Sequence, residues 1–487
     1  MIDGEEITMK SFGVQVSIID FTNSRLRRGD TTIYLDLSTD EELFNGRGDY
    51  QFDIYRLMRE RNGSFAVEPV WKILILDAYG QDIISPLLKV KQLRELGVTL
   101  HLLLDSKRES IPDVPAIYFV SPTQHNIDAI SEDLRRAMYD SYYLNMIYPI
   151  SRPLLEDLAV SAVQGGTHGQ IQKLTDQYVS FISLEDNLFM LKKYSENSST
   201  FRKINDPVTE MIEIDEVLNF IANGLFAVCV TLGVVPIIRC AKNNAAEQVA
   251  QKLDQKIRDN LRDARNNLFV QENVRTGQLL NLQRPVLIIA DRSIDLSTMM
   301  HHTWTYQTLI SDVLNMELNR VVVNDKNGKR KEYDMSASDD KLWSSFKSSP
   351  FPQVAEAIQD NLSTYRKNEE EIRRLKETMG VENPEEEGAV FVMGDATAQL
   401  NTAISSLPEL LEQKRLIDLH THIATIILDH IKERKFDTLF ETEEKLLNGQ
   451  DIQLMDILRL CTNDEDILRL VLIALCTRSF DAVIFLK

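Results

Sequence analysis

The chain has 487 residues, a hydrophobic content of 43% and a formal net charge of −20. This length predicts about two to four domains with sizeable cores, and the composition is ordinary for a soluble globular protein. The acidic excess argues against nucleic acid as a partner and against a general affinity for anionic membranes, because phosphates attract clustered Lys and Arg.

The cysteines and the apolar runs indicate the compartment. None of the four cysteines has CxxC spacing, and all lie in or beside apolar segments: Cys229, Cys240, Cys461 and Cys476. We therefore predict buried free thiols in a reducing cytosol. We find no signal peptide and no apolar run of the about 18 residues that a membrane span needs. These features predict a cytosolic protein that acts on membranes through partners.

The first readable domain follows an atypical N-terminal extension, residues 1–66, to which we assign no function. Alternating apolar residues in the extension predict strands at 14–19 and 31–37. The region 67–178 alternates strands with helices, which predicts a parallel, right-handed, doubly wound sheet. The expected strands are 72–76, 98–104 and 116–120, the expected long helices are 81–96 and 126–138, and two short helices split by Gly165–Gly166 fill 154–178.

Doubly wound sheets often bind nucleotides, so a nucleotide-binding enzyme is an alternative. The first strand leads into Asp77-Ala78-Tyr79-Gly80-Gln81, which offers one glycine where a dinucleotide fingerprint needs three. No GxxxxGK[ST] motif occurs in the sequence. The pattern therefore predicts the fold without its phosphate-binding loop.

A second α/β domain is expected at 179–298, with strands at 228–238 and 286–290 and a helix at 245–269. The short, β-branched run at 286–290 predicts a strand that is buried on both faces. Arg239 is interpreted as either a solvated charge at a strand end or a member of a buried ion pair. After this strand, Asp295 offers a side-chain cap, and 303–318 has apolar residues at helical spacing.

From residue 299 to 487 the pattern predicts a mainly helical third domain. A charged helix at 352–379 has a narrow apolar seam, and a second helix at 397–435 is interrupted by Pro408. The two helices could form a projecting hairpin. The seam either packs against its own domain or receives an amphipathic helix of another protein, and both interpretations stay open. Its residues are Ile358, Tyr365, Ile372 and Met379.

The sequence offers no catalytic or metal-binding motif. The histidine pairs 301–302 and 420–422 point to different faces of a helix, and HExxH spacing is absent. No GxSxG elbow and no protein-kinase motif set occurs. We therefore predict a binding protein that has no metal, no cofactor and no enzymatic activity.

Several long segments resemble one family. They include VLIIADRSIDLSTMMHHTWTYQTLISDVL from Val286, VWKILILDAYGQDIISPLLKVKQLRELGVTLHLLLD from Val70, LLEDLA from Leu154, VTLGVVPIIRCAKNNAAEQVAQKLD from Val230 and SSLPELLEQKRLIDLHTHIA from Ser405. The chain thereby resembles the SM (Sec-one/Munc-eighteen) proteins, and HHTWTYQ resembles the Sly-one branch. The resemblance implies α/β N-terminal domains, a helical third domain and an arch-shaped molecule. It implies a cytoplasmic protein that lies on ER and Golgi membranes through SNARE proteins and promotes vesicle docking and fusion.

The resemblance also implies site residues. A first-domain pocket for the N-terminal peptide of a Golgi syntaxin corresponds to residues on the LLEDLA helix and the helix after it: Leu155, Leu158, Ala159 and Ile171. The third-domain hairpin would template SNARE helices, with Ile358, Tyr365, Ile372 and Pro408 as its residues. The matching proline marks where the hairpin helix switches between folded-back and extended forms. Tethering complexes are a further candidate partner.

One departure from the family affects the second domain. Residues 479–487 no longer resemble the family, whose chain continues and returns to complete the second domain's sheet. We therefore expect a truncated third domain, in which about 352–435 form the projecting hairpin. We also expect an unpaired edge in the sheet of the second domain. Besides the nucleotide-binding enzyme, a helical tethering scaffold without SNARE selectivity is the other alternative.

Overall fold

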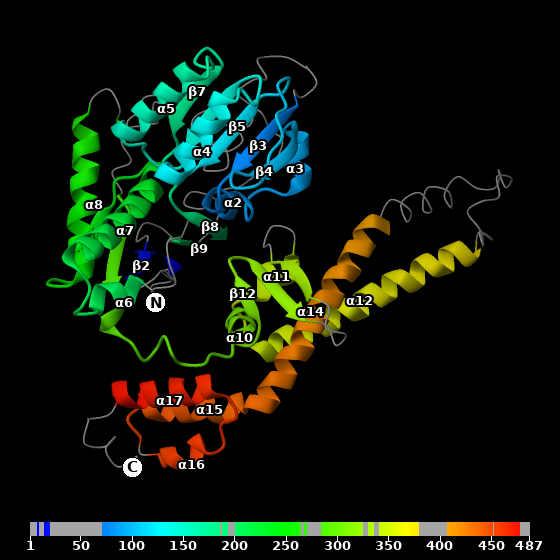
Figure 1. Cartoon of the computed structure of the whole chain (residues 1–487). Helices are drawn as coiled ribbons and strands as arrows, with labels where there is room; N and C mark the ends of the chain where they lie inside the picture. Colours follow the sequence, from blue (N-terminus) through cyan, green and yellow to red (C-terminus); the bar gives the residue numbers. More distant parts are fainter. Residues whose placement is uncertain are drawn as a thin grey trace. The chain divides into compact units, whose positions relative to one another are not determined.

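The computed structural model describes residues 7–8, 14–19, 71–185, 188–192, 200–263, 267–269, 284–324, 330–335, 340–378, 407–450 and 452–477. The chain divides into two compact units, Met1–Ile294 (unit 1) and Asp295–Lys487 (unit 2). Unit 1 has an α/β structure and unit 2 is mainly helical (Figure 1). The predicted fold class is confirmed.

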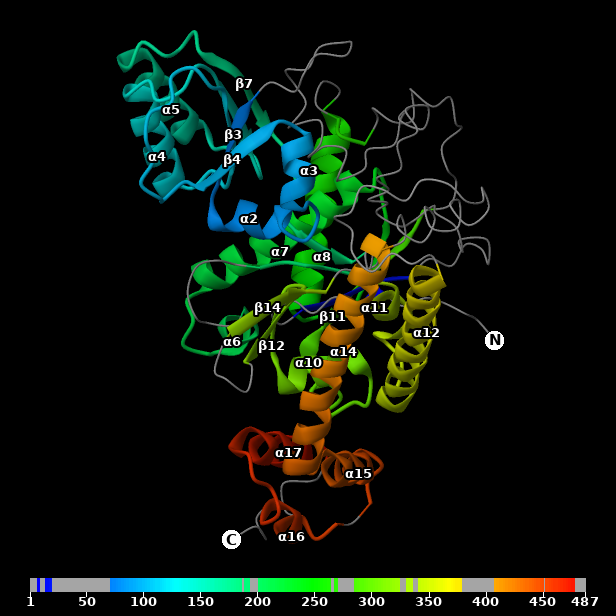
Figure 2. The ribbon, with the colours of Figure 1, turned by 90° about the vertical axis from the view of Figure 1, so that its right-hand side faces the viewer.

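The first sheet of unit 1 has five parallel strands in the order β4-β3-β5-β6-β7. The strands are β3 (Lys72–Leu76), β4 (Val98–Leu103), β5 (Ala116–Val120), β6 (Tyr142–Met146) and β7 (Ile171–Asp176). Their connections contain α2 (Ala78–Ile84), α3 (Val90–Glu95), α4 (Gln124–Arg135) and α5 (Arg152–Gln164). Figure 2 shows α4 and α5 on one side of the sheet and α3 on the other. Strands β3 and β5 are buried throughout, in keeping with sequences that are apolar except for Lys72 at the start of β3.

Two predicted elements of this domain were wrong. The helix expected at 81–96 is two helices, α2 and α3, because Pro86 between them has no backbone N–H to continue the first one. The second short helix expected before Tyr178 is the edge strand β7 instead. Gly166, at a φ of 69°, ends the preceding helix in the left-handed conformation that glycine adopts without strain.

The rest of unit 1 contains a second sheet and its helices. Helix α7 (Met211–Thr231) packs against α8 (Ala245–Arg262), and a short helix, α6 (Thr200–Asn205), precedes them. A separate antiparallel pair is formed by β8 (Ile182–Glu185) and β9 (Leu188–Met190). The strand predicted at 228–238 was wrong over most of its length, because residues 228–231 belong to α7. The chain turns at Gly233, with a φ of 63°, and only Ile237–Cys240 form strand β10.

The second sheet has the order β1-β2-β11-β10. Strand β11 (Val286–Asp291) runs parallel to β10 and antiparallel to β2 (Val14–Ile19), which pairs in turn with β1 (Ile7–Thr8). The strand predicted at 14–19 is confirmed, and the one predicted at 31–37 lies outside the described residues. Strand β2 covers one side of β11, whereas β10, at the end of the sheet, pairs with β11 alone among the described residues, in agreement with an unpaired edge. Burial on both faces was wrong, since only alternate residues of β11 are fully buried.

The structure also tests the expectations for Arg239, for the four cysteines and for a membrane-spanning helix. Arg239 in β10 is exposed, so it is a solvated charge. Cys229 is a buried thiol, whereas Cys461 is only partly buried, and Cys240 and Cys476 are exposed, which corrects the prediction of buried cysteines. Within the described residues, α7 is the single helix that is long and apolar enough to cross a membrane. Just over half of its most apolar window, 56%, is buried inside unit 1, as in the core helix of a globular domain.

Unit 2 combines helices with a small sheet that the sequence did not predict. Helix α10 (Tyr306–Val313) is shorter than the expected 303–318, and Asp295 caps a turn by accepting from the Thr298 N–H at 3.0 Å rather than capping a helix. Three antiparallel strands follow, β12 (Asn315–Glu317), β13 (Arg320–Asn324) and β14 (Arg330–Asp334). The helices after them are α11 (Lys341–Phe346), α12 (Phe351–Thr378), α14 (Leu407–Arg434), α15 (Phe436–Leu447), α16 (Leu454–Leu458) and α17 (Asp464–Thr477).

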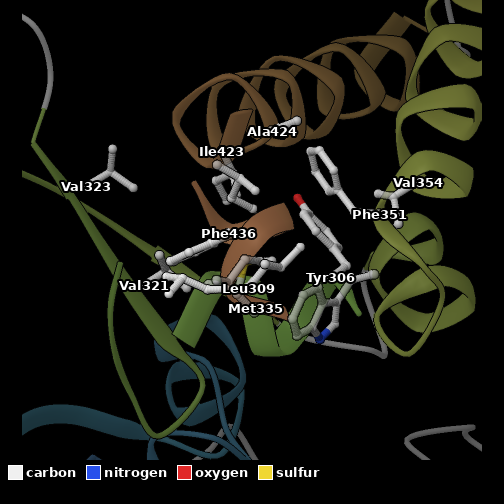
Figure 3. Packing of buried hydrophobic residues seen from close by; sticks show 14 of the residues in the cluster. Tyr306, Leu309, Val321, Val323, Met335, Phe351, Val354, Ile423, Ala424 and Phe436 are labelled. Carbon is white, nitrogen blue, oxygen red and sulfur yellow. The ribbon is translucent and has the colours of Figure 1, made fainter. Parts of the chain in front are cut away.

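One apolar core joins the elements of unit 2. Figure 3 shows Tyr306 and Leu309 of α10, Phe351 and Val354 of α12, and Ile423 of α14 converging in it. Val321 and Val323 contribute from the sheet, and Phe436 from α15. Because α10, the sheet and three long helices share this core, the packing of α12 against α14 depends on the whole unit.

Candidate functional site

Helix α5 presents the first candidate surface. Its buried side, Leu158, Ser161 and Ala162, follows helical spacing and packs on α4. The helix ends at Gly165, where a Cβ atom would lie only 2.4 Å from the carbonyl oxygen of Leu134. Glycine at this position therefore lets the end of α5 approach α4 closely. Because the inner face of α5 is fixed against α4, the residues on its outer face are held by a rigid helix.

The four residues assigned to the peptide pocket lie at different depths. Leu155 is 40% exposed and Ala159 is exposed, and they are one helical turn apart on the outer face. Leu158 is 2% exposed and belongs to the domain core. Ile171 is half-buried and begins strand β7, which corrects its expected place on a second helix. The outer face thus offers Leu155 and Ala159 directly, with Leu158 beneath them.

Helix α5 has more exposed apolar surface than the sequence interpretation assigned. Val160 is 55% exposed and Val163 is 67% exposed. Leu155, Ala159 and Val163 are successive i, i+4 positions, so they form one stripe along the helix. This spacing is visible in the sequence. A polar margin is supplied by Arg152 and Glu156, whose side chains form an i, i+4 ion pair at 2.9 Å.

The hairpin residues also lie at different depths. Ile358 and Tyr365 are buried, and Ile358 is part of the unit 2 core (Figure 3 shows its neighbours). Met379 and the side chain of Ile372 lie outside the described residues. Pro408 is the second residue of α14, where a missing N–H leaves no helical hydrogen bond unmade. Residues 397–406 lie outside the described residues. The prediction that Pro408 interrupts a helix beginning at 397 therefore stays a prediction.

A buried polar chain fixes α14 to the rest of unit 2. The Tyr306 hydroxyl lies 2.9 Å from Nδ1 of His420, and Nε2 of His420 lies 2.7 Å from Oδ2 of Asp340. Asp340 also caps α11 by accepting from the N–H of Trp343 at 2.9 Å. Burial alone would raise the pKa of Asp340, but His420 and the backbone donors more than offset it and hold the pKa below its ordinary value. These side chains orient the hairpin helix.

A second buried cluster, which we call the His302 clamp, joins the HHTWTYQ segment to the last helices. Glu443 of α15 is fully buried and accepts from the His302 backbone N–H at 2.8 Å and from its Nδ1 at 2.7 Å. Nε2 of His302 lies 3.4 Å from Asp466 of α17, which Arg434 also contacts through two hydrogen bonds of 2.8 and 2.5 Å. The clamp thus ties His302 to α14, α15 and α17.

The clamp shifts the pKa values of its members. Burial would lower the pKa of His302, but the nearby carboxylates of Asp466 and Glu443 outweigh it, so the pKa is raised. Burial would raise the pKa of Asp466, whereas His302 and Arg434 lower it to about 2. Protonated His302 therefore balances part of the carboxylate charge. Among the described residues no group of three His, Cys, Asp or Glu is arranged to hold a metal ion.

The crevice where a doubly wound sheet binds a nucleotide is occupied by the protein itself. This crevice lies where strand order reverses, between β3 and β5. Asp77 follows β3 and accepts from Gly80 N–H at 2.7 Å, from Ser121 N–H at 2.9 Å and from the Asn126 amide at 2.9 Å. The donors that would face a phosphate are therefore already bound to a carboxylate, whose charge also repels phosphate. This geometry argues against the nucleotide-binding alternative.

Comparisons with known proteins agree with this fold. The model of the Sec1 family matches residues 72–483. A second model, the Haspin like kinase domain, matches residues 5–79, a small part of the chain. The chain is 52% identical over 406 residues to mouse Sec1 family domain-containing protein 1, covering 80% of this chain and 63% of that protein. It is 50% identical over 405 residues to the Protein sly1 homolog of Drosophila melanogaster, covering 81% of this chain and 63% of that protein.

A solved structure extends the comparison. Sly1p in complex with an N-terminal peptide of Sed5p superposes with a TM-score of 0.68 at 31% identity, covering 89% of this chain and 69% of Sly1p. The chain therefore spans somewhat less than two thirds of the length of the curated relatives it matches. The family model covers most of the chain, and the sly1 relatives are about half identical to it across that region. The chain belongs to the Sec1 family, in its Sly1 branch.

Proposed function

We propose that this chain binds the N-terminal peptide of a Golgi syntaxin on the outer face of α5 and promotes SNARE assembly in ER–Golgi transport. The observation that carries the proposal is that Leu155 and Ala159 lie on the outer face of α5, whose inner face is buried against the domain. The similarity of this chain to Sly1p supports it. Sly1p itself has been crystallised with an N-terminal peptide of Sed5p. The activity is binding and orientation, and it uses no cofactor and no covalent chemistry.

The α5 face can supply useful affinity through a few contacts. Ala159 is small and leaves room for one apolar side chain of the peptide beside Leu155. Burying one Phe or Leu there would contribute about 1.5–3 kcal/mol, which corresponds to roughly ten- to a hundred-fold in Kd. Because Leu158 and Gly165 already fix α5 against α4, little conformational entropy is lost on binding.

We assign the templating role to the α12–α14 hairpin as a whole. Ile358 and Tyr365 support it from inside by packing, whereas Leu411, at 65% exposure, and Leu428, at 41%, lie on the surface of α14. A SNARE helix presents apolar residues at helical spacing, and such residues bind exposed apolar positions of a rigid helix. The Tyr306–His420–Asp340 chain keeps α14 in place while a partner binds.

We place the protein in the cytoplasm, at ER and Golgi membranes, where its SNARE partners would hold it. Tethering complexes are further partners in this proposal. The net charge of −20 supports recruitment by proteins over direct attraction to anionic lipids.

The proposal is tested by calorimetry with an N-terminal peptide of a Golgi syntaxin and the variant Ala159→Arg. Arginine at this exposed position fills the space for the peptide side chain, and we expect at least a ten-fold loss of affinity at an unchanged melting temperature. Gln164→Arg is the matched control, because it adds the same charge to an exposed position on the opposite side of α5. Equal affinities of the Ala159→Arg variant and the parent chain would reject α5 as the peptide site.

A further inference from the structure

The start of α7 and the turn before it carry a group of large apolar side chains that are more exposed than those of α5. Val208 is 85% exposed, Met211 is 76% exposed and Ile212 is 70% exposed. We call residues 208–212 the α7 projection. Single exposed apolar residues are common on protein surfaces, but three within five residues, each more than two thirds exposed, form a patch of the kind found at interaction sites.

The α7 projection is held in a defined conformation. In the turn before it, Val208 N–H donates to the Asp206 carboxylate at 3.0 Å, and Thr209 N–H donates to the Asp206 carbonyl at 3.1 Å. The N–H of Asp206 donates to the carbonyl of Arg202 in α6 at 2.8 Å. The apolar side chains are thus presented by a hydrogen-bonded turn and the first turn of a 21-residue helix.

Ion pairs anchor the base of the projection to both neighbouring helices. Lys252 of α8 lies 2.7 Å from Asp215, and Lys203 of α6 lies 4.0 Å from Glu213. The buried part of α7 begins only at Val217, so Met211 and Ile212 are not required by the core. Figures 1 and 2 both place α6 at the margin of unit 1, next to this turn. A preorganised apolar group that contributes nothing to its own core is suited to binding.

The charges around the projection define the partner's chemistry. Glu210 and Glu216 are exposed and form no ion pair within the described residues, and Glu213 adds a third exposed carboxylate. This acidic border repels anionic lipid headgroups and nucleic acid. A second copy of the chain, with a net charge of −20, is disfavoured for the same reason. A partner that matches both features has an apolar face bordered by Lys and Arg.

We propose that the α7 projection is a docking surface for a basic amphipathic helix of another protein. Val208, Met211 and Ile212 insert into the apolar face of that helix, and Glu210 and Glu216 pair with the Lys or Arg residues that border it. This surface lies on other elements than the α5 face and the α12–α14 hairpin, so the inference does not depend on the function proposed for either.

The test uses the full chain and a fluorescent Leu/Lys amphipathic peptide of about 18 residues, with a Leu/Glu peptide of the same pattern as its counterpart. Anisotropy titrations should show binding of the Leu/Lys peptide alone. The double variant Met211→Ser/Ile212→Ser should weaken it about ten-fold or more, because two buried apolar contacts are lost. The double variant Glu210→Gln/Glu216→Gln should weaken it and reduce its dependence on salt.

The matched control is Leu468→Ser/Leu472→Ser, which removes two exposed leucines from α17 and should leave the Kd within about two-fold. The melting temperature of every variant should stay unchanged, since all substituted residues are exposed. Equal Kd values for the Met211→Ser/Ile212→Ser variant and the parent chain would overturn the proposal. An equal loss of affinity in the α17 control would also overturn it. The same holds if the parent chain sediments with phosphatidylserine vesicles and the Met211→Ser/Ile212→Ser variant does not.

Discussion

The His302 clamp makes a quantitative prediction about unit 2. The substitution Glu443→Leu removes a fully buried carboxylate and leaves two donors of His302, its backbone N–H and its ring N–H, without an acceptor. Each unsatisfied buried donor costs about 1–3 kcal/mol, and breaking a buried charged pair by removing one partner costs about 3–5 kcal/mol. We therefore expect the free energy of unfolding to fall by about 3–5 kcal/mol.

The assay is urea denaturation of the full chain followed by tryptophan fluorescence. Trp343 is 1% exposed within the unit 2 core and Trp71 is 71% exposed in unit 1, so the fluorescence change on unfolding reports mainly on unit 2. Glu441→Leu is the matched control, because it removes a carboxylate of the same helix that is 67% exposed and paired with Lys445. We expect this control to change stability by less than about 0.5–1 kcal/mol.

The clamp also predicts a pH dependence with a definite sign. The pKa of His302 is raised in the folded protein, so its stabilising contribution is complete below the ordinary histidine value of about 6.5 and is lost as pH rises through the folded pKa. The pKa of Asp466 is about 2, so this carboxylate stays charged throughout that range. Burial raises the pKa of Cys461, the neighbouring thiol, which keeps it neutral near pH 7.

The unfolding free energy of the parent chain should therefore decrease from pH 6.5 upward more steeply than that of Glu443→Leu, which lacks the carboxylate that supports protonated His302. A Glu443→Leu variant within about 1 kcal/mol of the parent, or parallel pH profiles for the two proteins, would refute this account of the clamp.

Three further predictions concern the candidate sites. Leu158→Arg should unfold the first domain, because it buries a charge at a position that is 2% exposed; a folded variant, seen by circular dichroism, would place Leu158 on the surface. Asp340→Asn should destabilise unit 2 by about 2–4 kcal/mol in urea, because a neutral amide has one acceptor oxygen for the two donors, His420 and the Trp343 N–H, that the carboxylate satisfies; an effect below about 0.5 kcal/mol would show that the buried chain does not hold α14. Pro408→Ala should favour the extended hairpin and speed SNARE assembly in a liposome fusion assay; an unchanged rate would exclude a switch at this residue.

The buried strands of the first domain could be predicted because they consist almost entirely of apolar residues. Apart from Lys72 at the start of β3, strands β3 and β5 consist of apolar residues, and each is buried along its whole length. Edge strand β7, with the sequence IQKLTD, has a polar, half-exposed pattern that does not distinguish a strand from a short helix. Strands β12 and β14 of unit 2 were missed for the same reason, since NME and RKEYD contain few apolar residues.

The site could be predicted only in part. Helical spacing places Leu155 and Ala159 on one face of α5, but the spacing alone does not reveal that neighbouring Leu158 points inward. The same spacing would have added Val163 to the exposed stripe. The clamp was beyond prediction, because His302 and Glu443 are 141 residues apart and only the tertiary fold brings them together.

The central claim is that this chain captures the N-terminal peptide of a Golgi syntaxin. Calorimetric titration of the purified chain with N-terminal peptides from several syntaxins tests it most directly. We predict tight binding of the Golgi-type peptide and no heat from peptides of other syntaxins. A cooperative thermal melt together with no binding of the Golgi-type peptide would contradict the claim and leave the α12–α14 hairpin as the remaining basis for a role in SNARE assembly.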